Sequence, residues 1–223
     1  MRVLAAGSLR GVWPSLLRHF PEPVETAFGP AGLLRERIAA GEACDLFASA
    51  NLAHPRALYP LAVIPFARNS LCLTVRSDVL QQGDNWLSLL TRADLRLATS
   101  TAGEDPCGDY AQTLFDRMGD SGEGVRARAR GLVGGRHSAP IPAGKLAAEW
   151  IIHSGQAELF IGYASYASRL RTIPGLTVIA LPAPYNPCAE YGCAVITPAG
   201  QRLGMFLQSE VAKGILREAG FEA

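Results

Sequence analysis

The sequence lacks an excess of charge of either sign. Its 223 residues hold 21 lysines and arginines against 20 aspartates and glutamates, which gives a formal net charge of +1 at pH 7. Binding to nucleic acid needs a basic surface that neutralises several phosphates. We therefore expect no nucleic-acid partner, and an anionic ligand would have to be bound by local donors.

Long hydrophobic runs are also missing. No apolar stretch approaches the roughly 20 residues that cross a bilayer as a helix, so we expect a protein that does not span the membrane. The first residues, MRVLAA, are typical of a strand and not of a secretory signal peptide. A cytoplasmic location is therefore one hypothesis, and an exported protein whose leader is absent from this chain is the other.

Several chemical signatures are absent as well. There is no GxGxxG and no GxxxxGK[ST] pattern, and no set of histidines, cysteines and carboxylates has the spacing of metal ligands. The five cysteines include no CxxC pair, and their odd number excludes a fully paired framework. Cys188 and Cys193 are left open as a bridge or as two thiols. The sequence predicts neither a cofactor nor a metal.

An enzyme is the weaker interpretation. A cysteine nucleophile needs a histidine and a third, orienting group. Cys107 is the best candidate thiol, but none of the four histidines lies in a recognisable catalytic pattern. We therefore predict that the protein is not an enzyme.

Apolar segments of strand and helix character alternate along the whole chain, which predicts an α/β fold. Strands are predicted at residues 2–6, 24–28, 45–49, 70–75, 95–99, 159–162, 176–181 and 192–196. Helices are predicted at 9–20, 33–40, 86–90, 110–118, 145–153, 164–171 and, as a pair, 200–219. Residues 58–66 are expected to be irregular because they contain two prolines, and 120–135 to be loop with some helix.

Several loops end a strand and open a helix. A helix N-terminus has free N–H groups and the positive end of the helix dipole, so it attracts anions. Ser8, Ala31, Cys107 and Lys145 lie in or beside such loops, each next to a glycine or another small residue. Any one such turn is common in α/β proteins, and the prediction of an anion site depends on all of them together.

These segments resemble one family along nearly the whole chain. Residues 5–9 (AAGSL) are similar to the AAASL opening of the periplasmic molybdate-binding proteins of ABC transporters, and residues 28–51 match that family's FxxSxxLxxQIxxGxxxDLFxSAD segment without a gap. Residues 106–111 (PCGDYA) resemble its PAGxYA loop, and 159–163 (LFIGY) its GIVYxSDA segment. The order and spacing are more specific than any single fragment.

The resemblance implies a type II periplasmic-binding-protein fold with two α/β lobes and a hinge that the chain crosses twice. It predicts a first lobe of residues 1–70 plus 194–223 and a second of 71–193. It implies a monomer in the periplasm that captures molybdate or tungstate between the lobes and delivers it to an ABC permease. The alternative keeps the fold but makes the chain a cytoplasmic anion sensor, store or effector-binding module.

The resemblance also assigns ligand-binding residues. Ser8 matches a serine that donates through its hydroxyl and backbone, and Tyr163 matches a ligand tyrosine. Cys107 falls at a backbone N–H donor, and Lys145 near the remaining one. Ala31 stands where the family commonly has a second serine, so one hydroxyl donor is lost there. Lys145 adds a formal positive charge, and a charge-assisted hydrogen bond is roughly twice as strong as a neutral one.

Two further groups of charged residues lie beside these loops. Asp105 and Asp109 flank Cys107, and because carboxylates repel an oxyanion, we expect them to point outward or to cap the helix. Arg10 follows Ser8 closely, and it is interpreted either as facing the ligand or as part of a solvated helix face.

Overall fold

The chain folds into two compact units. The computed structural model describes all 223 residues. Unit 1 comprises Met1–Asn69 and Ala189–Ala223, and unit 2 comprises Ser70–Cys188. The predicted lobes were divided after residues 70 and 193, whereas the units are divided after Asn69 and Cys188. The second division lies earlier because the last strand pairs along its whole length with a strand of unit 1.

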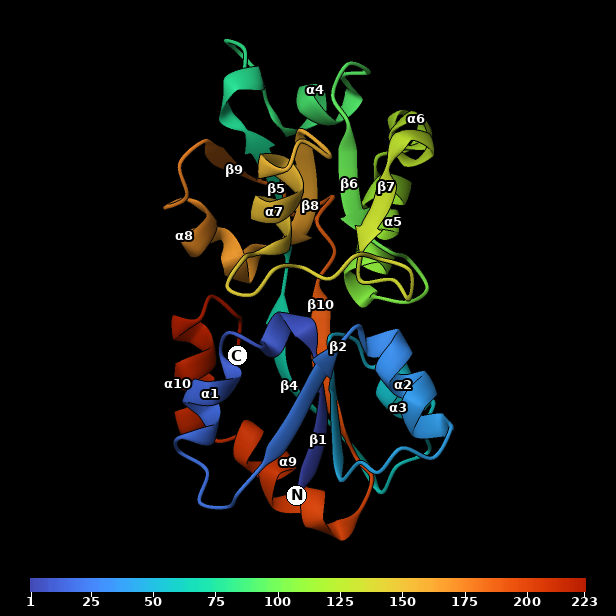
Figure 1. Cartoon of the computed structure of the whole chain (residues 1–223), viewed down its shortest axis with the longest axis vertical. Helices are drawn as coiled ribbons and strands as arrows, with labels where there is room; N and C mark the ends of the chain where they lie inside the picture. The colour runs from blue at the N-terminus through green and yellow to red at the C-terminus, as the bar shows by residue number, and fades with distance from the viewer. The chain divides into compact units, whose positions relative to one another are not determined.

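Unit 1 is built on a five-stranded sheet of order β2-β1-β3-β10-β4 (Figure 1). Strands β1, β2 and β3 are parallel to one another, and β10 runs antiparallel to β3 and β4. The bounds are β1 Arg2–Ala6, β2 Glu25–Gly29, β3 Leu46–Ser49, β4 Ala62–Asn69 and β10 Ala189–Val195.

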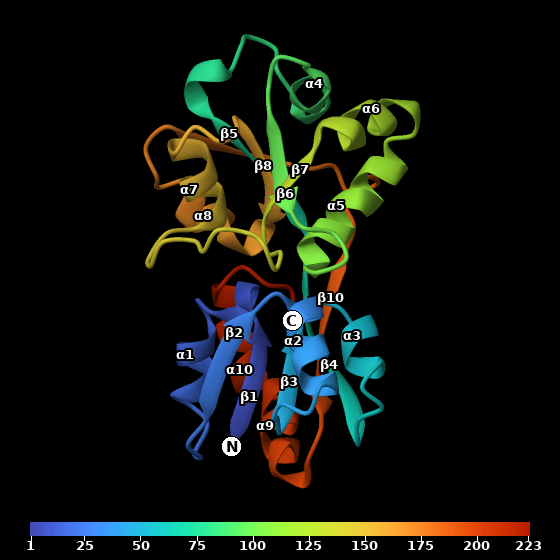
Figure 2. The same cartoon turned by 45° about the vertical axis from the view of Figure 1, so that its right-hand side comes forward.

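Helices cover both faces of this sheet, with α1 and α10 on one side and α2 and α3 on the other (Figure 2). This arrangement explains why β1 is apolar after Arg2, since Val3, Leu4 and Ala5 are all fully buried. The helices are η1 Gly7–Leu9, α1 Trp13–Leu17, α2 Ala31–Ala39, α3 Ala53–Arg56, η4 Pro198–Gly200, α9 Gln201–Leu207 and α10 Glu210–Glu218.

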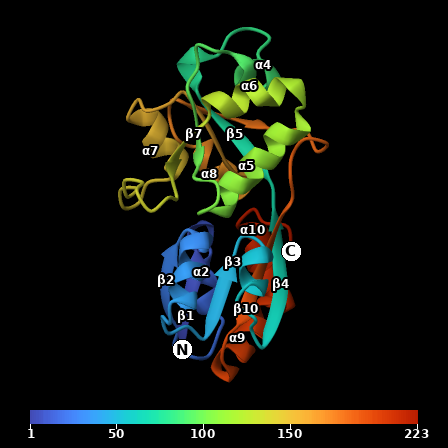
Figure 3. The same cartoon turned by 90° about the vertical axis from the view of Figure 1, so that its right-hand side faces the viewer.

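Unit 2 repeats the plan with a sheet of order β7-β6-β8-β5-β9, flanked by α5 and α6 on one side and by α7 and α8 on the other (Figure 3). Strand β6 is parallel to β7 and β8, whereas β5 is antiparallel to β8 and β9. The strands are β5 Leu71–Arg76, β6 Leu97–Ser100, β7 Arg130–Val133, β8 Leu159–Tyr163 and β9 Leu176–Ala180. The helices are η2 Ser77–Val79, α4 Trp86–Thr91, α5 Pro106–Arg117, α6 Asp120–Arg128, α7 Ala147–His153, η3 Ala164–Tyr166 and α8 Ala167–Leu170.

Three local predictions were wrong. Residues 120–135 were expected to be loop with some helix, yet residues 130–133 form strand β7, which pairs with β6. Residues 58–66 were expected to be irregular, yet β4 begins at Ala62 and contains Pro65. The proline is tolerated because β4 is the edge strand and because its pairing with β10 shifts register beside Pro65. The helix predicted at 9–20 is broken into η1 and the short α1, since Pro14 supplies no N–H to continue a longer helix.

Candidate functional site: two strand edges

The carboxyl ends of β1, β2 and β3 form one edge of unit 1. The chain leaves β1 to add β2 on one side and then returns to add β3 on the other, so the connections diverge at this edge. Ligands of open α/β sheets bind at such a switch point. Ser8 follows β1 directly and Ala31 follows β2, so the fold brings these two predicted residues to the same edge.

Ser8 is held by a residue from the far end of the sequence. Its Oγ accepts a hydrogen bond from the hydroxyl of Tyr191 at 2.9 Å. Tyr191 lies on β10 and is fully buried, with Phe221 packed edge-on at a centroid distance of 5.4 Å. A serine hydroxyl can donate as well as accept, so the bond from Tyr191 orients a group that has the chemistry to donate to an anion.

The N-terminus of α2 offers backbone donors. Ala31 is its first residue, Pro30 precedes it, and no side chain caps the helix. The first four N–H groups of an α-helix have no partner within the helix, and the first three here belong to Ala31, Gly32 and Leu33 because Leu34 donates to the Pro30 carbonyl. The methyl of Ala31 is buried and adds no donor, so this loop contributes only its backbone.

The corresponding edge of unit 2 carries the other predicted residues. The connections diverge here too, because β7 is added on one side of β6 and β8 on the other. Helix α5 with Cys107 follows β6, and Tyr163 is the last residue of β8. Tyr163 is 4% exposed, its backbone pairs with Leu71, and its carbonyl accepts a weak hydrogen bond from the thiol of Cys72.

The N-terminus of α5 already has a negative group. Asp105 caps it, and Oδ1 of Asp105 accepts a hydrogen bond from the Cys107 N–H at 3.2 Å. Asp109 accepts one from the Gly103 N–H at 2.7 Å. The expectation that Asp105 caps the helix is confirmed, and it follows that an anion reaches the Cys107 N–H only in competition with this carboxyl group.

Burial raises the pKa of both the Asp105 carboxyl and the Cys107 thiol. It raises the pKa of the Asp105 carboxyl to about 6, with repulsion from Asp109 adding to the effect and the bonds from Cys107 and Ser100 opposing it. Burial also raises the pKa of the Cys107 thiol well above its ordinary value. An activated nucleophile needs the opposite shift, so the surroundings of Cys107 do not favour catalysis by this thiol.

Lys145 lies two residues before α7 and was predicted to be at the start of that helix. Its ammonium forms an ion pair with Glu149, one turn further on, and its backbone N–H donates to the carbonyl of Pro142 at 3.1 Å. The ion pair lowers the pKa of the Glu149 carboxyl. Lys145 therefore has an intramolecular partner, which an anion would have to replace.

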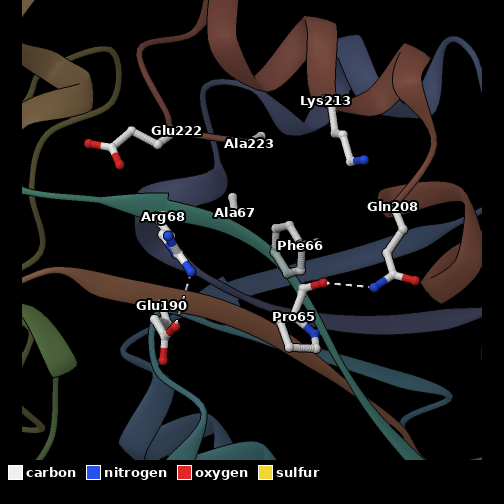
Figure 4. A pocket seen from close by; sticks show the side chains of 9 residues that line it. All are labelled: Pro65, Phe66, Ala67, Arg68, Glu190, Gln208, Lys213, Glu222 and Ala223. Carbon is white, nitrogen blue, oxygen red and sulfur yellow. Dashed lines mark hydrogen bonds and ion pairs between the residues drawn. The ribbon is translucent and has the colours of Figure 1, made fainter.

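A separate cavity of about 650 Å³ lies in unit 1 beside the edge strand β4 (Figure 4). Its charged lining is mixed, with Arg68 and Lys213 against Glu190 and Glu222, and Arg68 pairs with Glu190 at 3.8 Å. None of the predicted ligand residues lines it. Because its charges balance, this cavity does not select an anion.

Two further observations concern metals and membranes. No group of three or more histidines, cysteines and carboxylates is placed to hold a metal ion. None of the helices combines the length and the apolar character needed to cross a bilayer.

Residues 1–222 match the family of bacterial extracellular solute-binding proteins. The chain belongs to this family.

A relative from Pasteurella multocida, the uncharacterised protein PM1146, is 43% identical over 99% of this chain and 98% of its own length. Among solved structures, the periplasmic molybdate-binding protein of Azotobacter vinelandii is similar over 100% of this chain and 99% of its own, with a TM-score of 0.79 and 18% identity. The sulfate-binding protein SubI of Mycobacterium tuberculosis covers 99% of this chain and 85% of its own, with a TM-score of 0.76 and 16% identity. The predicted two-lobed α/β fold of this solute-binding protein is confirmed.

Proposed function

We propose that the chain captures a small tetrahedral oxyanion outside the cytoplasm and delivers it to an ABC permease. Molybdate and tungstate are the first candidates. The observation that carries the proposal is the edge of unit 1. There, a serine hydroxyl fixed by Tyr191 adjoins the uncapped N-terminus of α2 at a switch point of the sheet. The molybdate- and sulfate-binding proteins that share the fold support an anion as the ligand.

Unit 1 contributes the Ser8 hydroxyl and the N–H groups that begin at Ala31. Unit 2 has its own candidate donors, namely the Tyr163 hydroxyl, the Cys107 N–H and Lys145, and an anion would have to displace the present partners of the last two. All of these donors except Lys145 are neutral, so Lys145 is the one permanent positive charge among them. Capture leaves the ligand chemically unchanged and needs no cofactor, and a monomer suffices.

Selectivity follows from fixed donors. A sulfate is smaller than a molybdate, and in a site sized for the larger ion it leaves buried donors unpaired, at roughly 1–3 kcal/mol for each. The Tyr191 bond and the backbone of α2 make two of the donor groups rigid. Rigidity therefore converts a small difference in ion size into a difference in affinity.

The experiment that tests the donor set is calorimetric titration of molybdate into the wild type, Ser8→Ala and Ser15→Ala. Ser15 lies on α1 in the same unit, where its hydroxyl accepts a bond from Arg18, so it controls for loss of a serine. We expect Ser8→Ala to weaken binding by about tenfold or more and Ser15→Ala to leave it unchanged. Equal affinities for all three proteins would remove Ser8 from the site.

Lys145 has its own test. If the Lys145 ammonium leaves Glu149 and binds the anion, Lys145→Ala should weaken molybdate binding. Unchanged affinity would assign Lys145 to a structural ion pair with Glu149 alone.

A further inference from the structure

Arg10 lies two residues after Ser8, and its backbone is part of the same turn. Its N–H donates to the carbonyl of Gly7 at 3.1 Å, which closes the turn η1 that carries Ser8. The position of Arg10 relative to Ser8 is therefore fixed by the backbone. The side chain itself is exposed.

The guanidinium group of Arg10 is held over an aromatic ring. Its central carbon lies 5.4 Å from the centroid of Phe28, the penultimate residue of β2, which is paired with Ala5 of β1. Stacking uses the flat face of a guanidinium, whereas its N–H donors lie in the plane. The contact with Phe28 thus orients Arg10 at the carboxyl edge of the sheet and leaves its donors available.

Arg10 also has no acidic partner, because it takes part in none of the ion pairs of the structure. Other arginines of unit 1 do form such pairs, as in Arg2 with Glu25 and Arg37 with Glu42. An exposed arginine that is fixed on a ring and has no counter-ion is ready to bind an anionic group from outside the chain.

We propose that Arg10 is a specificity-determining residue that binds a carboxylate of the ligand, next to the tetrahedral group held by Ser8. This inference rests on the proposed function of the same edge. The neutral donors of Ser8 and α2 suit the tetrahedral group, and the planar fork of Arg10 matches a carboxylate in a bidentate geometry. The ligand class then extends from the free oxyanion to small carboxylic acids that bear a phosphate or a similar tetrahedral group.

The test compares two probes that differ only in the carboxylate, namely phosphoglycolate and methyl phosphate. Both are titrated by calorimetry into the wild type, Arg10→Gln and Arg18→Gln, with molybdate as the reference anion. Arg18 is an exposed arginine at the end of α1 that bonds Ser15, so its replacement makes the same change in net charge. We expect the wild type and Arg18→Gln to prefer phosphoglycolate by about tenfold or more.

In Arg10→Gln this preference should vanish while the affinity for methyl phosphate stays the same. Equal binding of the two probes by the wild type would overturn the inference, as would equal loss of both probes in Arg10→Gln. If molybdate binds in either case, the proposed function stands while the role of Arg10 fails. If molybdate and both phosphates all fail to bind, the proposed function fails with it.

Discussion

The hydroxyl of Tyr191 donates to Oγ of Ser8 at 2.9 Å, joining two residues that are 183 positions apart in the chain. Tyr191 belongs to β10, the strand on which the chain returns to unit 1, and Ser8 follows the first strand. The tyrosine ring is packed edge-on by Phe66 and Phe221. The bond therefore ties the orientation of a predicted ligand residue to the core of unit 1.

Replacing Tyr191 by Phe tests this relationship. The ring packing is retained and one hydrogen bond is lost, so we expect a loss of about 1 kcal/mol in the free energy of unfolding. Affinity for the oxyanion should fall by about three- to tenfold, because the Ser8 hydroxyl is no longer oriented. Urea unfolding and calorimetry measure the two effects.

The control for Tyr191→Phe is the same substitution in a protein that already has Ser8→Ala. There, the loss of the tyrosine hydroxyl should have no further effect on affinity, because its partner is gone. A full additional loss in the double variant would show that Tyr191 acts independently of Ser8.

We predict that Asp105 makes the free energy of unfolding depend on pH. The pKa of its carboxyl is raised from 3.8 to about 6 in the folded chain, so the folded state holds this proton more tightly than the unfolded state does. Ionisation then opposes folding, and the contribution of Asp105 to the free energy of unfolding falls as pH rises from about 4 to about 6. Asp105→Asn should accordingly stabilise the protein by on the order of 1–2 kcal/mol near pH 7.

Asparagine caps a helix as well as aspartate does, so the gain from Asp105→Asn should shrink as the pH is lowered towards about 4. Urea unfolding of both proteins across this range measures it. The same variant should bind the oxyanion more tightly near pH 7, since it removes a competing charge from the Cys107 N–H. A pH-independent difference in stability would contradict the assignment.

We predict that a side chain at Gly134 would clash with the carboxyl group of Asp105. Gly134 has φ of +73°, and a Cβ there would lie 2.4 Å from Oδ2 of Asp105. Gly144 has a similar φ of +78° but open space around it. Both alanine variants bear a backbone cost of about 1 kcal/mol, but Gly134→Ala should lose at least about 1 kcal/mol more in urea unfolding. Equal losses would mean that Asp105 moves away freely.

We predict that a serine in place of Ala31 increases the affinity for molybdate. Helix α2 begins at this residue without a side-chain cap. The molybdate-binding proteins that the sequence resembles commonly have a serine at the matching position. Ala31→Ser should strengthen molybdate binding by about three- to tenfold in calorimetry, since it adds one donor beside the backbone N–H groups. Weaker binding by the variant would indicate that the loop does not face the anion.

The sequence was sufficient to predict the alternation of strands and helices and the strand-to-helix junctions at Ser8, Ala31 and Cys107. These features depend on local periodicity and on the residues that begin and end helices. Strand β4 was missed because Pro65 argues against a central strand, and only the sheet order shows that β4 is an edge.

Contacts between distant residues were not predictable in this way. Nothing near Tyr191 in the sequence indicates that its hydroxyl meets Ser8, because that bond depends on the return of β10 to unit 1. The raised pKa of Asp105 depends in the same way on burial, which the local sequence does not specify. The pairing of Lys145 with Glu149 is the exception, since their spacing of four residues is visible in the sequence.

The most direct test of oxyanion capture is calorimetric titration of the wild-type protein with molybdate, tungstate, sulfate and phosphate at a fixed pH near 7. The proposed function predicts saturable one-to-one binding of at least one of these anions with a Kd below about 100 μM. It also predicts that Ser8→Ala weakens that binding. Failure of all four anions to bind more tightly than about 100 μM would contradict the assignment of this solute-binding protein to oxyanions.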